Sequence, residues 1–199
     1  MKIRTCCCLV LVAVMCSVSC APRVGSPDEV AVFETSYGRI VIEFFPDAAP
    51  NHVATFKELF REGFFEGTKI HRLLKEQGRP IAIQGGDPNS VNGDPTTWGR
   101  GLPGQKTLRA EISKTLIHER GTVSAAHKPK EKDTAASQFF ICVTPEPRFD
   151  GQYTIFGKVI EGMNVVDSIA RAPLVKSTER PVDPVAVNRA YLAKREEIK

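Results

Sequence analysis

Three short segments contain the residues with which this sequence could do chemistry. They are His71-Arg72-Leu73, Gln84-Gly85-Gly86-Asp87 and Ala135-Ala136-Ser137-Gln138-Phe139-Phe140-Ile141. Their side chains include an arginine, two glutamines and a phenylalanine, but no activated nucleophile, no acid/base pair and no set of metal ligands. If they meet in one pocket, they suit a reaction that needs none of these, such as rotation about an amide bond.

Two further patterns are typical of ligand sites, but their context argues against that function. Residues 99–104 match the G-x-G-x-x-G template of dinucleotide binding, yet residues 94–97 before them are not strand-like. Pro103 also obstructs the helix that the template requires. The four histidines form no i, i+4 pair and have no cysteine partner. We therefore expect no metal site and no cofactor. Asp87 and Asp150 lie at turns, where capping is the expected role of an aspartate.

Length and charge indicate one soluble globular domain. The chain has 199 residues, of which 42% are hydrophobic and 25% charged, with a formal net charge of +4. No block of like charges runs five or more residues, and the densest charge run, residues 128–133, has mixed signs. We expect this run to be a solvated loop, and we expect no nucleic-acid binding.

The N-terminal segment is typical of a secretory signal peptide. Lys2 and Arg4 give a short basic start, residues 9–15 are an unbroken apolar run, and small residues follow at a cleavage position. We assign residues 1–19 to this signal and expect an exported protein. The apolar run is too short for an ordinary membrane-spanning helix.

Cys20 is the predicted lipidation site. Small residues before it and Ala21-Pro22 after it resemble a bacterial lipoprotein signal, although Ser17 stands where leucine is usual. The resemblance implies that Cys20 becomes the lipidated N-terminus and holds the protein on the periplasmic or outer side of a membrane. The alternatives are cleavage to a soluble secreted protein and a retained anchor. Residues 20–29 are predicted to be a flexible tether, and Cys142 a small buried core residue.

Apolar periodicity predicts the elements that hold the three segments. Residues 30–35 and 39–44 should form an antiparallel hairpin. An amphipathic helix is expected over 50–62, ending at Gly63, and a second over 162–171. Short apolar runs with Gly/Pro turns indicate a closed barrel or a sandwich, and they lie at 81–83, 121–125, 139–143 and 153–159. The tail over 188–199 is either a helix or the continuation of a late strand.

Six ordered blocks between Val32 and about Leu192 resemble the cyclophilin family of peptidyl-prolyl isomerases. They are Thr35-Ser36-Tyr37-Gly38, Ala49-Pro50-Asn51-His52-Val53-Ala54-Thr55-Phe56, His71-Arg72-Leu73, Gln84-Gly85-Gly86-Asp87-Pro88, Ser137-Gln138-Phe139-Phe140-Ile141 and Phe156-Gly157-Lys158-Val159. The resemblance implies an eight-stranded antiparallel β-barrel closed by two helices, in a domain of residues 30–199, and no cofactor.

The resemblance also assigns roles to residues. Arg72 matches the catalytic arginine, which donates a hydrogen bond to the proline nitrogen when the peptide bond twists. Gln84 is expected to position Arg72, and Phe140 to form the floor of the proline pocket. The residues expected to bind the substrate are Ile81, Ala82, Ala126, His127, Gln138, Phe149 and Tyr153.

Several positions depart from the family pattern. Ile81 and Ala82 replace bulkier pocket residues, which implies a wider or shallower pocket. Arg148 stands where eukaryotic members have tryptophan, which implies weak cyclosporin binding, and His127 replaces an asparagine. The segments 75–80 and 128–134 are longer than usual.

The expected function is prolyl cis-trans isomerisation. The protein would accelerate rotation of X–Pro bonds in proline-containing peptides and in unfolded exported proteins, and we expect a monomer. The departures at Ile81, Ala82 and His127 leave one alternative, a non-catalytic peptide-binding or chaperone module on the same barrel.

Overall fold

The computed structural model describes residues 28–198 of the chain. The predicted signal peptide, Cys20 and all but the end of the tether lie outside the described residues. In the described part, no helix is both long and apolar enough to cross a membrane.

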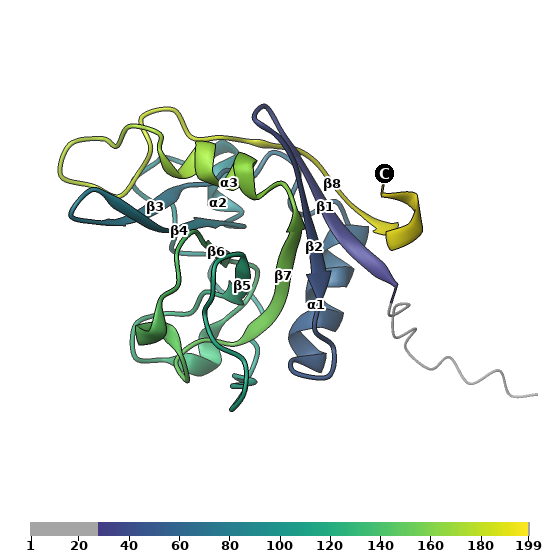
Figure 1. Cartoon of the computed structure of the whole chain (residues 1–199). Coiled ribbons are helices and arrows are strands. Elements are labelled where there is room, and N and C mark those ends of the chain that lie inside the picture. Colours follow the sequence, from purple (N-terminus) through teal and green to yellow (C-terminus); the bar gives the residue numbers. More distant parts are fainter. Residues whose placement is uncertain (1–27, 199) are drawn as a thin grey trace, which may run out of the picture.

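Eight antiparallel strands form one curled sheet (Figure 1). The strands are β1 (Glu29–Thr35), β2 (Gly38–Phe44), β3 (Arg72–Glu76), β4 (Arg79–Gly85), β5 (Thr122–Ala125), β6 (Phe139–Cys142), β7 (Ile155–Glu161) and β8 (Val187–Lys194). Their order across the sheet is β3-β4-β6-β5-β7-β2-β1-β8. This arrangement confirms the antiparallel, mainly β fold expected from the sequence.

The two ends of the sheet are joined by hydrogen bonds between the residues that precede β3 and the residues at the start of β8. The Gly67 amide donates to the Val187 carbonyl at 2.8 Å, and the Val187 amide donates back to Thr68 at 2.8 Å. The Ile70 amide donates to the Val185 carbonyl at 2.9 Å. These bonds satisfy backbone groups that an open sheet edge would leave unpaired.

Three α-helices accompany the sheet: α1 (Pro50–Arg61), α2 (Asn89–Asn92) and α3 (Met163–Ala170). Two were expected, and the one-turn helix α2 is an addition. Pro50 begins α1 because its fixed φ suits the first helical position. At the other end Gly63 has a φ of 67°, and the Phe64 amide donates to Leu59 while the Gly63 amide donates to Phe60. This is the Schellman motif that a C-terminal glycine allows.

A cluster of phenylalanine rings fills the core between α1 and the sheet. Phe56 on α1 stacks on Phe156 of β7 with ring centroids 4.2 Å apart, and Phe33 of β1 stacks on Phe139 of β6 at 5.1 Å. Burying each ring stabilises the fold by about 1.5–3 kcal/mol. Since side chains alternate along a strand, burying Phe139 turns Phe140 to the opposite face of the sheet.

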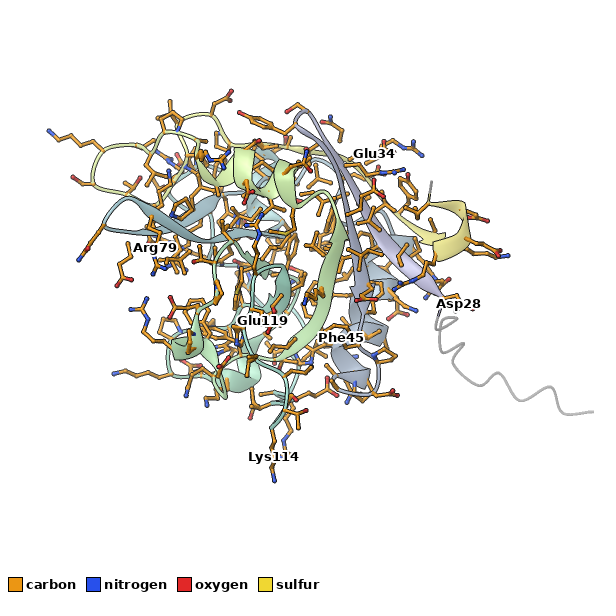
Figure 2. All side chains as sticks on the ribbon, in the orientation of Figure 1. Asp28, Glu34, Phe45, Arg79, Lys114 and Glu119 are labelled. Atoms are coloured by element: carbon orange, nitrogen blue, oxygen red, sulfur yellow. The ribbon has the colours of Figure 1, made fainter. Side chains whose placement is uncertain are left out.

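One segment differs from the expectation, and in the tail the structure selects the strand from the two alternatives that the sequence left open. Residues 75–80, which the sequence indicates as a lengthened turn, are the end of the β3–β4 hairpin, whose two-residue turn Gln77-Gly78 has φ values of 49° and 82°. Positive φ at both positions fits the twist of a tight hairpin. The tail is strand β8 over Val187–Lys194, followed by a single 3-10 turn over Arg195–Glu197. Charged side chains such as Arg79 and Lys114 project outward from the molecule (Figure 2).

Candidate active site

The sheet register brings the three sequence segments into one row. Arg72 on β3 is the cross-strand partner of Gln84 on β4, and Gln84 is the partner of Phe140 on β6. Phe140 in turn lies opposite Ser124 on β5. Directly opposed residues have Cβ atoms about 4.5–5.5 Å apart. The row therefore places the three predicted catalytic residues side by side.

Hydrogen bonds link the polar side chains of the site into a chain. Arg72 Nη1 donates to Gln84 Oε1 at 3.0 Å, and Gln84 Nε2 donates to Gln138 Oε1 at 3.0 Å. Gln138 Nε2 then donates to the Gly99 carbonyl at 3.1 Å. Each amide accepts on one side and donates on the other, so the orientation of every group is fixed by its neighbours. We call Arg72, Gln84 and Gln138 the polar row.

The loop after α2 supports the far end of the polar row. The Gly99 amide donates to the carboxylate of Asp87, and Asp87 also accepts from the Asn89 amide at the start of α2. Asp87 therefore holds backbone at turns, which is the capping role expected from the sequence. The G-x-G-x-x-G match over 99–104 thus lies in a loop that backs Gln138.

Glu179 is a site residue that no pattern in the sequence indicates. Arg72 Nε donates to Glu179 Oε2 at 2.6 Å, and the Leu73 amide donates to the Glu179 carbonyl at 2.7 Å. Glu179 lies in the long loop between α3 and β8, so only the folded chain brings it to β3. Arg72 is half-exposed, with 44% of its side chain accessible. Its guanidinium is held by Gln84 on one side and by Glu179 on the other.

Phe140 forms an apolar floor beside the polar row. Its ring meets Phe149 edge-on at a centroid distance of 5.4 Å and Tyr153 at 5.0 Å. Such edge-to-face contacts are favourable for aromatic rings. The other members of this cluster are Ile81, Ala82, Cys142, Leu74 and Ala126. Five of the predicted binding residues therefore gather around Phe140: Ile81, Ala82, Ala126, Phe149 and Tyr153.

A buried histidine lies beneath the floor and was not expected at the site. The His118 ring stacks on Phe140 at 5.9 Å with an interplanar angle of 14°. Its Nδ1 lies 2.8 Å from Asp150 Oδ1 and its Nε2 lies 3.0 Å from Ser124 Oγ. A carboxylate can only accept, so Nδ1 carries the proton and Nε2 accepts from the Ser124 hydroxyl. Burial lowers the pKa of His118, although Asp150 opposes this effect.

Cys142 is a core residue, as the sequence predicts. It is fully buried next to the floor, and burial raises the pKa of its thiol to about 12. The thiol is therefore protonated near neutral pH and unsuited to nucleophilic chemistry.

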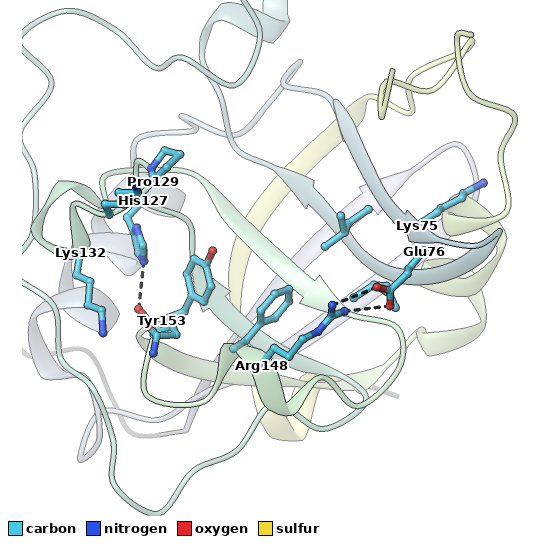
Figure 3. Close-up of a pocket in the computed structure, with 12 residues that line it drawn as sticks. Lys75, Glu76, His127, Pro129, Lys132, Arg148 and Tyr153 are labelled. Carbon is cyan, nitrogen blue, oxygen red and sulfur yellow. Dashed lines mark hydrogen bonds and ion pairs between the residues drawn. The ribbon is translucent and has the colours of Figure 1, made fainter. Parts of the chain in front are cut away.

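A cavity of about 530 Å³ adjoins the floor (Figure 3). Phe149 and Tyr153 line it and also contact Phe140, so the two features are continuous. The three side chains of the polar row do not belong to the described residues that line this cavity. His127 does: its ring stacks on Tyr153 at 4.5 Å, and its nitrogens lie 2.8 Å from the Lys128 carbonyl and 3.1 Å from the Gln152 carbonyl.

Arg148, which stands where eukaryotic cyclophilins have tryptophan, lines the cavity. It donates to Glu146 at 2.6 Å and to both carboxylate oxygens of Glu76 at 3.1 Å. The second pair bridges two walls of the cavity. Within residues 28–198, no group of three or more His, Cys, Asp or Glu side chains is placed to hold a metal ion.

Comparison with known proteins gives the family. The family described as cyclophilin type peptidyl-prolyl cis-trans isomerase/CLD matches residues 30–192. Relatives include a peptidyl-prolyl cis-trans isomerase of Arabidopsis thaliana, 35% identical over 83% of this chain and 93% of its own length. Another is the isomerase of Helicobacter pylori, 35% identical over 74% of this chain and 83% of its own length. A longer relative from Gibberella zeae, a peptidyl-prolyl cis-trans isomerase-like 2 protein, is 35% identical over 79% of this chain, which spans only 25% of its length.

Solved structures agree with these relatives. A cyclophilin type isomerase of Cryptosporidium parvum, solved in the presence of the dipeptide Ala-Pro, has a TM-score of 0.71 at 29% identity. The match covers 83% of this chain and 99% of that one. A Hirschia baltica cyclophilin shares the fold with a TM-score of 0.65 at 23% identity, over 83% of this chain and 74% of that one. Together, the curled antiparallel sheet, the matched region and the relatives show that this chain belongs to the cyclophilin family of peptidyl-prolyl cis-trans isomerases.

Proposed function

We propose that this isomerase accelerates X–Pro rotation through a hydrogen bond from Arg72 to the proline nitrogen. The observation that carries this proposal is the double support of the Arg72 guanidinium, which Gln84 and Glu179 hold at the edge of the Phe140 floor. A donor fixed in this way loses little freedom when the transition state forms.

The chemistry of the peptide bond explains why one fixed donor is useful. Amide resonance opposes rotation with a barrier of about 20 kcal/mol. Twisting the bond breaks the resonance, and the nitrogen then gains a lone pair that accepts a hydrogen bond. A planar amide nitrogen offers no such acceptor. The Arg72 bond therefore stabilises the twisted state more than the ground state, which is the condition for catalysis.

The other side chains bind and orient the peptide. Phe140, Phe149 and Tyr153 offer aromatic faces and edges for the proline ring. Gln84 and Gln138 offer amide groups to the peptide backbone. The Cryptosporidium relative was solved in the presence of Ala-Pro, which supports a proline-containing peptide as the ligand here.

Exchange spectroscopy on an Ala-Pro peptide tests this function. We expect the purified protein to raise the cis/trans exchange rate far above the uncatalysed rate of about 0.01–0.1 per second. The second candidate is a non-catalytic peptide-binding module. One observation favours it: the Glu179 carboxylate accepts a hydrogen bond from Arg72 and would compete with the proline nitrogen for this donor. Peptide binding without faster exchange would select that second function.

We further propose that the protein acts on exported proteins from a membrane surface, anchored by lipid on Cys20. The basic start, the apolar run and the small residues before Cys20 support this location. Mass spectrometry of the N-terminus tests it: a mature chain that begins at a lipidated Cys20 is expected. An unmodified Cys20, or a chain that begins elsewhere, would contradict the anchor.

A further inference from the structure

We propose that this enzyme prefers proline peptides with an acidic residue within two positions of the proline. The inference rests on the proposed function, because it concerns the cavity that continues from the Phe140 floor. Four cationic side chains and only one carboxylate line this cavity: Lys75, Lys130, Lys132 and Arg148 against Glu76. Figure 3 shows Lys132 and His127 on one side of the cavity and Glu76 on the other, while the ammonium group of Lys75 points away from the cavity.

The positive charge of the cavity is not neutralised within the protein. Arg148 forms ion pairs with Glu76 and Glu146. The ammonium group of Lys132 instead donates to the Gly151 carbonyl at 2.8 Å. That of Lys75 donates to the Ala172 carbonyl at 2.8 Å, which directs its charge away from the cavity. Carbonyl oxygens fix the position of an ammonium group without cancelling its charge. Among the described residues, no carboxylate lies within ion-pair distance of Lys130 or Lys132, and these two lysines carry the uncompensated charge of the cavity.

The loop that carries two of these lysines is fixed by its own hydrogen bonds. The Lys128 amide donates to Thr134 Oγ1 at 2.9 Å, and the Thr134 hydroxyl donates to the Glu131 carbonyl at 2.7 Å. The Glu131 amide donates back to the Lys128 carbonyl at 3.0 Å. Lys130 lies at the tip of this closed loop. The segment 128–134, longer than usual for the family, therefore presents its lysines at the cavity wall.

Aromatic and cationic groups lie next to each other on this wall. The proline ring would contact Phe149 and Tyr153, both of which line the cavity together with Lys130 and Lys132. A carboxylate near the proline would then meet uncompensated ammonium groups, whereas a lysine there would be repelled. At the opposite end of the site, Glu179 already pairs with Arg72. The preference should therefore arise in the cavity and not at the polar row.

Matched peptides measure this preference. Each peptide carries Glu, Gln or Lys two positions before or two positions after the proline of an X–Pro unit, and kcat/KM is measured by exchange spectroscopy. At 20 mM salt we expect kcat/KM for the Glu peptide to exceed that for the Lys peptide about five- to tenfold on at least one side, because the weak attraction of one charge and the similar repulsion of the other add. The ratio should approach one at 1 M NaCl, where the screening length is about 3 Å. The double variant Lys130→Glu/Lys132→Glu should invert the ratio.

A control variant separates the cavity from the overall charge. Lys114 and Lys194 are exposed and do not line the cavity. The double variant Lys114→Glu/Lys194→Glu changes the net charge equally and should keep the Glu/Lys ratio of the wild type. If this control shifts the ratio as much as the cavity variant does, the local preference is wrong.

The outcomes distinguish this inference from the function on which it rests. Catalysis on the Gln peptides with a Glu/Lys ratio near one on both sides would overturn the preference and leave the isomerase function intact. No catalysis on any peptide would overturn the proposed function. In that case, the dissociation constants of the same peptides from NMR titration still test the preference, and equal affinities would overturn it.

Discussion

The two sides of the site are built in different ways. The polar row comes from the neighbouring strands β3 and β4 and from the residue directly before β6. Each of its side chains is hydrogen-bonded to the next. The cavity wall comes largely from loops, and its charged groups bond to backbone carbonyls or to one another across the opening. The row fixes a donor beside the floor, while the wall surrounds an open volume of about 530 Å³.

This difference indicates that the polar row and the cavity wall have separate roles. Sheet register leaves the row little freedom, because moving one residue by a single position turns its side chain to the other face. Loops accept substitutions and insertions at much lower cost. We therefore propose that the row carries out the chemistry and that the wall selects the peptide, with the Phe140 floor shared by both.

Removing the shared floor should have the largest effect on stability. Phe140→Ala deletes a ring that contacts Phe149, Tyr153 and His118. We expect the free energy of unfolding to fall by about 3 kcal/mol and KM to rise, measured by urea denaturation and exchange kinetics. Phe140→Leu is the matched control, and it should cost less than about 1.5 kcal/mol. A loss below about 1 kcal/mol for the alanine variant, against that usual cavity cost, would show that row and wall do not share a packed floor.

Removing the second support of Arg72 should have a smaller effect, confined to the row. Glu179→Ala leaves the guanidinium held by Gln84 alone, and we expect kcat to fall about fivefold, equivalent to about 1 kcal/mol, with KM unchanged. Glu179→Gln keeps an acceptor for Nε and should restore most of the lost kcat. Equal kcat values for the alanine variant and the wild type would remove Glu179 from the mechanism. If Gln behaves like Ala, its role is not hydrogen bonding.

The pH dependence of stability tests the buried support of the floor. Burial lowers the pKa values of His118 and His71. A lowered histidine pKa means that the unfolded chain binds more protons as the solution becomes acidic. The urea midpoint should therefore fall as the pH drops below about 6.5, the ordinary histidine pKa.

A variant separates the two histidines. His118→Gln removes the titrating group beneath Phe140 and should reduce the dependence of the urea midpoint on pH. The dependence that remains in this variant is expected to come from His71. A wild-type midpoint that stays constant or rises between pH 7 and pH 5.5 would contradict the burial of neutral imidazoles.

The sequence predicted the regular elements well because their signals are local. The helix expected over 50–62 spans Pro50–Arg61, and the one expected over 162–171 spans Met163–Ala170. In both, apolar residues repeat at the helical period and a proline or glycine marks an end. Strand β3 was missed because Arg72–Glu76 is short and mixes charged and apolar residues.

The site was less predictable because its contacts are long-range. Arg72, Gln84 and Phe140 were selected through family resemblance, and no spacing rule links residues so far apart in the chain. Glu179 and His118 carry no local signal: one is an ordinary glutamate in a long loop, and the other an isolated histidine. The cations of the cavity wall come from three separate segments, so only the fold reveals that they gather.

Arg72 is the residue of the polar row on which the proposed catalysis depends most, and one measurement tests its role directly. Exchange kinetics and peptide affinity are measured for Arg72→Ala, with Arg189→Ala as the control. Arg189 is also an exposed strand arginine paired with one glutamate, Glu34, but it lies on β8. We predict that kcat/KM falls about 100-fold or more for Arg72→Ala, that its peptide affinity changes much less, and that Arg189→Ala matches the wild type. Full activity in Arg72→Ala would contradict catalysis by a hydrogen bond from this arginine to the proline nitrogen.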